Sequence, residues 1–235
     1  VNWNLYPAIV KPVNQHASYG ISREAIVENE HELKRRVEYV HETFQSAALI
    51  EEFIDGPEFH VLVWGNTPPT VLPAVQLEYG HAADWHDRLY TYEAKFDEHS
   101  AAMKKIRFLC PAMMEPRTRL SIESATLQAY RTLGCRDYAR IDVRVREGQA
   151  YVIDVNANPD ISSFSVAVMA AEAAGYHYDQ MVTQIVRFAA ERWPVQRPML
   201  MSTQHQWAAD LNRTPSESEI DYGGWAQNQK PAKGS

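Results

Sequence analysis

The chain has 235 residues, 45% of them hydrophobic and 23% charged, which is typical of a soluble globular protein with one large domain or two smaller ones. No apolar run approaches the length of a membrane-spanning helix and no basic segment precedes an apolar leader, so we expect no membrane partner and a cytoplasmic location. The net charge of −7 argues against a nucleic-acid partner but leaves room for a local cationic pocket that binds phosphates.

The first half of the chain is predicted to combine short strands with one helix. A polar loop over 14–20 follows the first strand, and Asn29 with Glu32 forms a capping pattern for an amphipathic helix. The strands are expected over 8–11, 48–51, 59–64 and 70–77, and a Gly- and Pro-rich turn over 65–69 separates the last two.

The second half begins with residues 80–117, a polar and irregular stretch that is typical of long loops over a site. Three helices are expected after it, over 120–133, 165–174 and 178–193. The first of them is predicted to bury Ile122, Ala125, Ala129 and Leu133.

The mixed order of strands and helices predicts an α+β fold. Neither a GxGxxG nor a GxxxxGK[ST] motif is present, which excludes the dinucleotide-binding fold and the P-loop. Cys110 and Cys135 have no CxxC spacing, so we expect reduced, buried thiols. Because the sequence starts at Val1 and not at Met, we expect it to be part of a longer protein.

Residues 138–156 carry the most informative pattern, that of a β-hairpin with a turn over 147–149. Alternation predicts that one face of its first strand is apolar and the other charged. Pairing of positions that sum to 296 then sets Asp142 opposite Asp154, and Arg140 opposite Asn156. On the second strand, Tyr151, Ile153 and Val155 are expected to share one face, and Val152, Asp154 and Asn156 the other.

Two carboxylates that face each other need a compensating cation. Mg²⁺ fits, because it binds one or two carboxylates together with amide oxygens, waters and substrate phosphates. The alternative is that Arg140 or Arg144 neutralises both aspartates. The hairpin by itself does not decide between the two.

Four other features are consistent with a nucleotide site, and each has a simpler structural explanation. Lys11 ends a strand before the loop of Ser18 and could contact phosphates, or it could be a solvated lysine. Acidic residues over 51–58 could accept hydrogen bonds from a nucleoside, or they could mark a charged edge strand. Lys95 lies among aromatic residues and could be a second cation at a triphosphate, but a lysine in such surroundings more often only packs on the surface. Ser165 could bind an anion or only cap a helix.

The segments AIVKPVNQHASYG, LIEEFIDGPEFHV, YEAKF, CPA and GCRDYARIDVRV with YVIDVNANPDISSFS resemble, in order and spacing, the D-alanine–D-alanine ligase family of the ATP-grasp ligases. The likeness extends from residue 6 to about residue 192. It implies an ATP-grasp fold with two α+β subdomains that clasp ATP, a central one over 1–79 and a C-terminal one over 80–193. A separate N-terminal domain of the family is absent from the sequence, and residues 194–235 are expected to form a loosely ordered polar tail.

The resemblance also implies roles for individual residues. Those expected to bind ATP are Lys11 and Lys95 at the phosphates, Ser18 in the loop over them, Glu51 and the backbone of Glu52, Phe53 and Ile54 at the adenine, and Glu58 at the ribose. The residues expected to hold Mg²⁺, or Mn²⁺ in its place, are Asp142, Asp154 and Asn156. Arg140, with a backbone N–H near Asp160, would stabilise an oxyanion, and Ser165 would hold the carboxylate of the second substrate.

In this family ATP phosphorylates a carboxylate, and the amine of a second amino acid attacks the acyl phosphate. The resemblance therefore implies small-molecule amino acid or hydroxy acid substrates and a place in peptidoglycan biosynthesis, and it leaves room for a homodimer.

The sequence departs from the family pattern at several positions. Ala17 and Phe96 replace a serine and a tyrosine whose hydroxyls tie loops together, and Phe96 also occurs in relatives that use D-lactate. Asp154 replaces a glutamate, Phe164 a histidine and Asp160 a glycine. These changes leave two alternatives: a ligase for another amino or hydroxy acid, and a nucleotide-binding module without ligase turnover.

Overall fold

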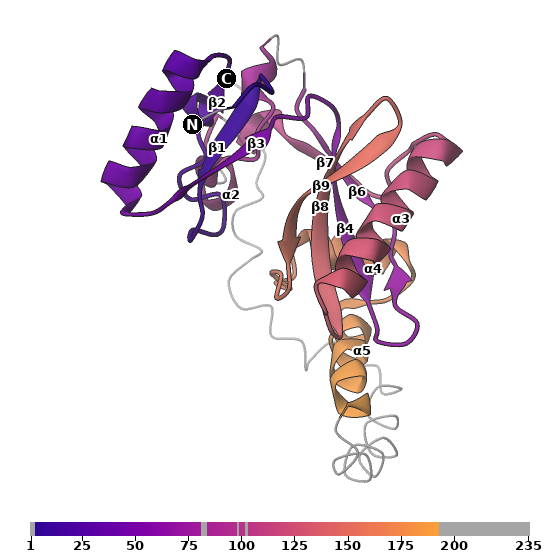
Figure 1. The fold of residues 1–235 in the computed structure, drawn as a ribbon. Helices are drawn as coiled ribbons and strands as arrows, with labels where there is room; N and C mark the ends of the chain where they lie inside the picture. The colour runs from indigo at the N-terminus through magenta and orange to yellow at the C-terminus, as the bar shows by residue number, and fades with distance from the viewer. Residues whose placement is uncertain (1–2, 81–83, 98, 102, 193–235) are drawn as a thin grey trace, which may run out of the picture. The chain divides into compact units, whose positions relative to one another are not determined.

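The computed structural model describes residues 3–80, 84–97, 99–101 and 103–192. The chain divides into two units, Val1–Phe188 and Ala189–Ser235, and the first contains two antiparallel β-sheets with helices packed on them (Figure 1). This confirms the α+β class. The predicted polar tail over 194–235 lies outside the described residues. In the part of the chain that is described, no helix is long and apolar enough to cross a membrane.

The smaller sheet has three strands in the order β2-β1-β3 and carries helix α1 on one face (Figure 1). Asn29 caps α1 as predicted, because its side chain accepts a hydrogen bond from the Glu32 N–H. Leu33 and Val40 of the helix pack against Val10 of the sheet in a buried cluster. The elements are β1 (Ala8–Pro12), β2 (Ile26–Val27), α1 (Glu30–Phe44) and β3 (Ala48–Glu52).

The larger sheet has six strands, five of them in the order β7-β6-β4-β8-β9, with β5 paired to β4. Its strands are β4 (Glu58–Trp64), β5 (Thr70–Val71), β6 (Val75–Glu78), β7 (Arg107–Leu109), β8 (Tyr138–Arg146) and β9 (Gln149–Asn156). The remaining helices are the short α2 (Tyr92–Phe96), α3 (Pro116–Thr132), α4 (Val166–Ala173) and α5 (Tyr178–Glu191). Three single turns of 3₁₀-helix complete the described part, at Arg23–Ala25, Trp85–Asp87 and Met103–Lys105.

Strand β4 is buried along its whole length because helices cover both faces of the sheet. Val61 and Val63 pack against α3 through Ile122, while Leu62 and Trp64 pack in a second cluster with residues of α4 and α5. A strand with both faces covered is a continuous apolar run, not an alternating one. The polar residues at its start therefore need a specific partner.

The structure corrects two expected elements and the expected burial of the cysteines. The strand predicted over 70–77 is two short strands, because Pro73 lies between them and cannot donate a ladder hydrogen bond. The stretch over 80–117, expected to be irregular, contains α2 and β7. The cysteines are free, as predicted, but half-buried.

The buried stripe of α3 confirms the prediction for Ile122, whereas the predicted Ala125 and Ala129 are only partly buried against the core. The residues fully buried on it are Ile122, Thr126 and Tyr130, which follow one another at four-residue spacing. Thr126 can lie in this apolar stripe because its hydroxyl donates to the Ile122 carbonyl, 2.8 Å away. Leu133 follows the last helical residue and is 63% exposed, so it is not a core residue.

The subdomain border predicted after residue 79 falls inside the larger sheet, whose strands β6 and β8 lie on either side of it in the sequence. The smaller sheet ends at Glu52, and β4 begins the larger one at Glu58. We therefore propose to place the border between the two subdomains in residues 53–57.

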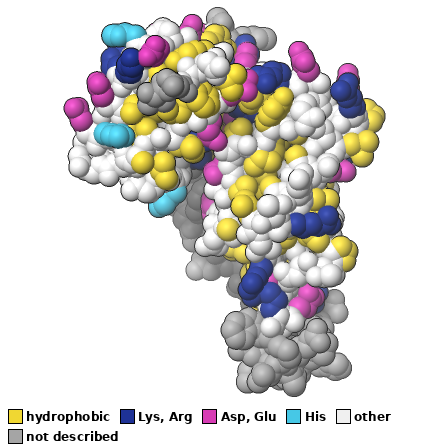
Figure 2. Space-filling model, viewed as in Figure 1, with side chains coloured by type: hydrophobic (Ala, Val, Ile, Leu, Met, Phe, Trp, Pro, Cys, Tyr) yellow, Lys and Arg dark blue, Asp and Glu magenta, His cyan; other side chains and the backbone are white. Residues whose placement is uncertain are grey.

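Charged and hydrophobic side chains are interspersed on the described surface shown in Figure 2. One exposed ion pair joins Lys34 and Glu30 on α1, with 2.7 Å between the Lys34 Nζ and a Glu30 carboxylate oxygen. A denser group of charged side chains lines a cavity in the first unit.

We expect the segment that connects the two sheets to tolerate only glycine at position 56. A Cβ atom at this position would lie 1.9 Å from the Val145 carbonyl oxygen, so an alanine must push the connector away from β8. We expect Gly56→Ala to lower the free energy of unfolding by about 2–3 kcal/mol, the upper range for overpacking. Urea denaturation would measure the loss. Gly134→Ala is the control: its Cβ would meet nothing within 4 Å, and only the left-handed φ of +66° would cost about 1–2 kcal/mol. Equal losses for the two variants would contradict the role of Gly56.

Candidate functional site

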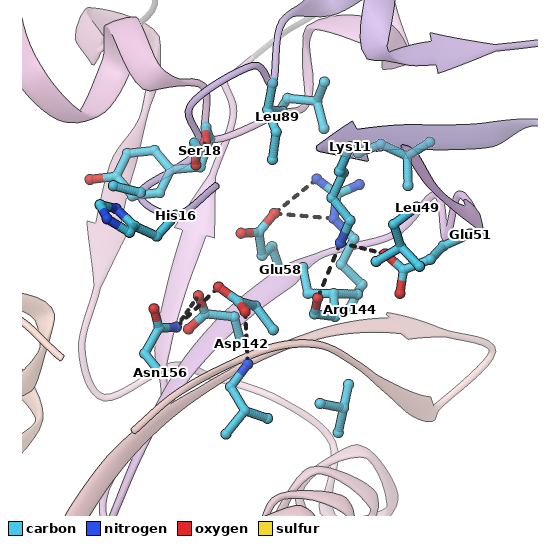
Figure 3. A pocket seen from close by; sticks show the side chains of 18 of the residues that line it. Lys11, His16, Ser18, Leu49, Glu51, Glu58, Leu89, Asp142, Arg144 and Asn156 are labelled. Carbon is cyan, nitrogen blue, oxygen red and sulfur yellow. Dashed lines mark hydrogen bonds and ion pairs between the residues drawn. The ribbon is translucent and has the colours of Figure 1, made fainter. Parts of the chain in front are cut away.

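A cavity of about 860 Å³ lies within the first unit, in the size range of small-ligand pockets (Figure 3). It is bordered by β1 and β3 of the smaller sheet, by the loop after β1, and by β8 and β9 of the larger sheet. Eleven of the thirteen residues predicted for the site line it: Lys11, Ser18, Glu51, Glu52, Phe53, Ile54, Glu58, Lys95, Asp142, Asp154 and Asn156. The other two, Arg140 and Ser165, are not among the lining residues.

The hairpin of β8 and β9 has the predicted pairing where the candidate metal ligands lie. Asp142 pairs with Asp154, and Arg140 with Asn156. Toward the turn the register is different. Glu147 and Gly148 both have left-handed φ values, 54° and 77°, and form a two-residue turn, so Gln149 belongs to β9 and not to a three-residue turn.

A register shift between Asp142 and Val143 joins the two parts of the hairpin. Val152 pairs with Val143, whereas Asp154 pairs with Asp142, so Ile153 is the extra residue of a β-bulge. The predicted regular alternation along β9, with Val152 on the face of Asp154, is therefore wrong. Without the bulge the partner of Asp142 would be Ile153.

One of the two hairpin carboxylates, Asp142, is paired with an arginine of the same strand. Arg140 donates two hydrogen bonds to Asp142, from Nε at 2.8 Å and from Nη2 at 2.9 Å. Burial works to lower the pKa of Arg140, but the facing Asp142 carboxylate outweighs it and raises the pKa. Arg140 thus neutralises Asp142, as expected if an arginine takes the place of a metal ion. It does not neutralise Asp154.

The donor set of the hairpin fits a hard divalent cation. The Asn156 amide nitrogen lies 3.3 Å from an Asp142 oxygen and 3.2 Å from an Asp154 oxygen, so all three side chains converge (Figure 3). Turning this amide over would present its oxygen instead. In the described part of the chain, no group of three or more His, Cys, Asp or Glu side chains is arranged to hold a metal. An ion here would therefore need Asn156 and ligands from a substrate or water, which is the usual coordination of Mg²⁺.

Two lysines approach the cavity from different elements. Lys11 forms an ion pair with Glu51 across β1 and β3, and its Nζ lies 3.4 Å from the Ile153 carbonyl oxygen of the bulge (Figure 3). Lys95, on α2, lies over the Tyr90 ring with 4.9 Å between its Nζ and the ring centroid. Burial, followed by the nearby Arg140, lowers the pKa of Lys95. Two ammonium groups are thus available to an anionic ligand.

The loop of Ser18 is held against the segment before α2. The Ser18 hydroxyl donates to the Tyr90 carbonyl oxygen at 2.8 Å. Ala17 and Ser18 both have left-handed φ values, 56° and 63°, which non-glycine residues adopt only when contacts compensate.

A buried polar cluster that the sequence interpretation missed underlies the cavity. Glu58 pairs in register with Arg144, and His60 with Asp142, across β4 and β8. Glu58 accepts from Arg144 at 2.8 Å and from the Tyr79 hydroxyl at 2.8 Å. Burial alone would raise the pKa of Glu58, but the Arg144 charge and the hydrogen bonds hold it well below its usual value. The signal in the sequence was a glutamate and a histidine at alternate positions of a strand that is otherwise apolar.

The predicted adenine segment and Ser165 are also engaged within the protein. The Phe53 N–H donates to the Pro7 carbonyl, and the Ile54 carbonyl accepts from Arg144. Ser165 is the N-cap of α4, where its hydroxyl accepts from the Val168 N–H at 3.4 Å. The cap explains this serine structurally, and its role toward a substrate stays a prediction.

The chain is similar to known proteins over most of its length. Residues 1–187 match the family model described as D-ala D-ala ligase C-terminus. A protein of Sinorhizobium fredii named y4sG is 35% identical over 190 residues, and the D-alanine–D-alanine ligase of Alcanivorax borkumensis is 32% identical over 188 residues. Each of these alignments covers 80% of the chain, and they cover 53% and 55% of the respective relative.

Among solved structures, the D-alanine–D-alanine ligase from Bacillus anthracis complexed with ATP is similar, with a TM-score of 0.61 and 25% identity. The match covers 79% of this chain and 53% of that one, so the chain spans about half the length of its relatives. The predicted ATP-grasp type of α+β fold is thereby confirmed. By its sequence and its fold, the chain belongs to the D-alanine–D-alanine ligase family, whose C-terminal part it matches.

Proposed function

We propose that the protein is an ATP-dependent carboxylate–amine ligase that forms a peptide bond through an acyl phosphate. The observation that carries the proposal is the cavity itself, in which the hairpin carboxylates, both lysines and the loop of Ser18 meet although they come from distant parts of the sequence. A solvated lysine or a charged edge strand, the simpler explanation of each feature alone, gives no reason for this convergence.

The chain's residues would divide the chemistry among them. Lys11 and Lys95 bind the phosphates of ATP, and Asp142, Asp154 and Asn156 hold Mg²⁺. Bound there, Mg²⁺ would neutralise charge on the phosphate oxygens. The shorter Asp154 in place of the family's glutamate favours one ion over two.

Arg140 would serve the reacting centre. Its guanidinium is preorganised by Asp142 and lies at the metal end of the hairpin, where negative charge develops as the amine attacks the acyl phosphate. Ser165 at the start of α4 would hold the carboxylate of the second substrate, because a helix N-terminus attracts anions.

The substrates are small amino acids or, as the second candidate, a D-hydroxy acid acceptor. Phe96 favours the second candidate, because a phenylalanine at this position also occurs in relatives that use D-lactate, whereas Ala17 only lacks a hydroxyl that ties the loops together. The side chain of Phe96 lies outside what the structure describes.

ADP release by the full-length protein is the direct test of the proposed function. With ATP, Mg²⁺ and a panel of D-amino acids and D-hydroxy acids, we expect at least one pair to stimulate ADP formation well above the rate with ATP alone. A coupled assay for ADP, with mass spectrometry of the product, would identify the pair. Tight ATP binding without stimulation by any acceptor would instead support the nucleotide-binding module.

Asp142→Asn should weaken nucleotide binding only when Mg²⁺ is present. Loss of one anionic ligand should reduce the Mg²⁺-supported affinity for ATP by about 10-fold or more, at least as much as loss of a group that orients a ligand. Calorimetric titration at several Mg²⁺ concentrations would measure the change. The control is Asp179→Asn on α5, which removes a carboxylate that does not line the cavity and should leave ATP binding unchanged. Unchanged Mg²⁺ dependence in Asp142→Asn would contradict the metal site.

Arg140→Ala should separate binding from turnover. Removal of an oxyanion donor is expected to reduce the turnover number by about 10²–10³-fold, while the affinity for ATP changes little. Steady-state kinetics and equilibrium binding of ATP would be compared in the same preparation. Arg140→Lys keeps the charge without the paired donors, so partial recovery of turnover is expected. A defect confined to ATP affinity would show that Arg140 has a different role.

A further inference from the structure

Arg144 is 2% exposed although it borders the cavity, and the proposed reaction gives it no role. Its guanidinium donates in three directions. Nε and Nη2 donate to one Glu58 oxygen at 3.1 and 2.8 Å, and Nη1 donates to the Ile54 carbonyl oxygen at 3.1 Å. Nη2 also donates to the Arg88 carbonyl oxygen. One side chain thus connects β8 to β4, to the connector after β3 and to the loop before α2.

Stability alone does not account for this arrangement. A buried ion pair is often no more stabilising than well-packed apolar residues of the same volume, because both charges lose their hydration. An apolar replacement, however, could not bind two backbone carbonyls at the same time. The planar fork of an arginine can, since it carries five donors in fixed directions.

The segments that Arg144 holds are those expected to surround the nucleoside. Ile54 and Phe53 belong to the backbone segment predicted to read the adenine, and the Phe53 ring centroid lies 4.8 Å from the Arg144 guanidinium carbon. Arg88 directly precedes Leu89 and Tyr90, which line the cavity. The phosphate ligands, in contrast, lie on β1, α2 and the far end of the hairpin.

We propose that Arg144 is a positioning residue that sets base selectivity: it fixes the Ile54 carbonyl and the loop at Arg88–Tyr90 around the adenine of a bound purine nucleotide. Glu58 is the anchor that orients the guanidinium: its Oε2 accepts from Nε and Nη2 of Arg144, while its Oε1 lies 3.2 Å from His60 Nε2. The inference rests on the proposed function, because it needs ATP in this cavity. In addition to the residues of the proposed function, Arg144 would act on the choice of base and not on the phosphates or the reacting groups.

The test compares ligands that differ only at the base end. Dissociation constants for ATP, GTP and inorganic tripolyphosphate would be measured by calorimetry, with Mg²⁺, on the full-length protein and on Arg144→Lys. Lysine keeps the charge opposite Glu58 but cannot span the two carbonyls. We expect ATP affinity to fall by about 10-fold or more, as for other groups that orient a binding residue, with the preference for ATP over GTP reduced in proportion. Affinity for tripolyphosphate should stay unchanged, since its expected ligands keep their places.

Two further variants keep the result interpretable. Glu58→Gln with Arg144→Met removes both buried charges together, so it should fold even where Arg144→Lys does not, and the same loss of base selectivity is expected. Tyr130→Phe removes a buried hydrogen bond from α3 to the Gly65 carbonyl, directly after the end of β4, and should bind all three ligands as before.

Three outcomes would overturn the inference. An unchanged ATP-to-GTP ratio in Arg144→Lys would show that Arg144 does not position the base site, and an equal loss for ATP and tripolyphosphate would show a general structural role. Absence of ATP binding by the unchanged protein would overturn the proposed function itself, and this inference with it.

Discussion

The one-residue bulge in β9 decides which side chains face the cavity. The two-residue turn at Glu147–Gly148 starts the hairpin in a register that would pair Asp142 with Ile153. Because side chains alternate with period two, that register would turn Asp154 away from Asp142. The bulge corrects the offset by one residue, and it also places the Ile153 carbonyl within 3.4 Å of Lys11. The candidate metal ligands and a candidate phosphate ligand thus depend on the same irregularity.

The cavity contains charges that are paired now and could exchange partners with a ligand. Arg140 compensates Asp142, and Glu51 compensates Lys11. A divalent cation would offer Asp142, and a triphosphate would offer Lys11, a stronger partner of the proper sign, so these two groups would exchange ion pairs on binding. Glu58 and Arg144 differ from them: both are almost fully buried and their partners are fixed on every side. We therefore assign that pair to the scaffold.

How much could be predicted from the sequence depended on whether a feature was local. Alternation in β8 predicted correctly that Ile141 and Val143 are buried on one face and that Asp142 shares the other with Arg140. The pairing of β4 with β8 was not predictable, because its partners lie more than seventy positions apart in the sequence and no local pattern encodes them. The cluster of Glu58 with Arg144 was missed for that reason. The bulge was missed because a regular period was assumed through the turn.

Closure over the cavity relies on contacts other than the hydroxyl pair typical of the family. The loop of Ser18 is joined to the segment before α2 by a hydrogen bond to the Tyr90 carbonyl and by an edge-to-face contact of Tyr19 with Tyr92, whose ring centroids lie 5.3 Å apart. The Tyr19 ring also meets Phe44 at the end of α1, 5.4 Å away. Such ring pairs contribute about 0.5–1.5 kcal/mol each beyond burial, enough together to offset much of the strain of the left-handed Ala17 and Ser18. Loss of the hydroxyl at position 17 therefore changes what the loop can offer to a substrate more than it changes whether the loop can close.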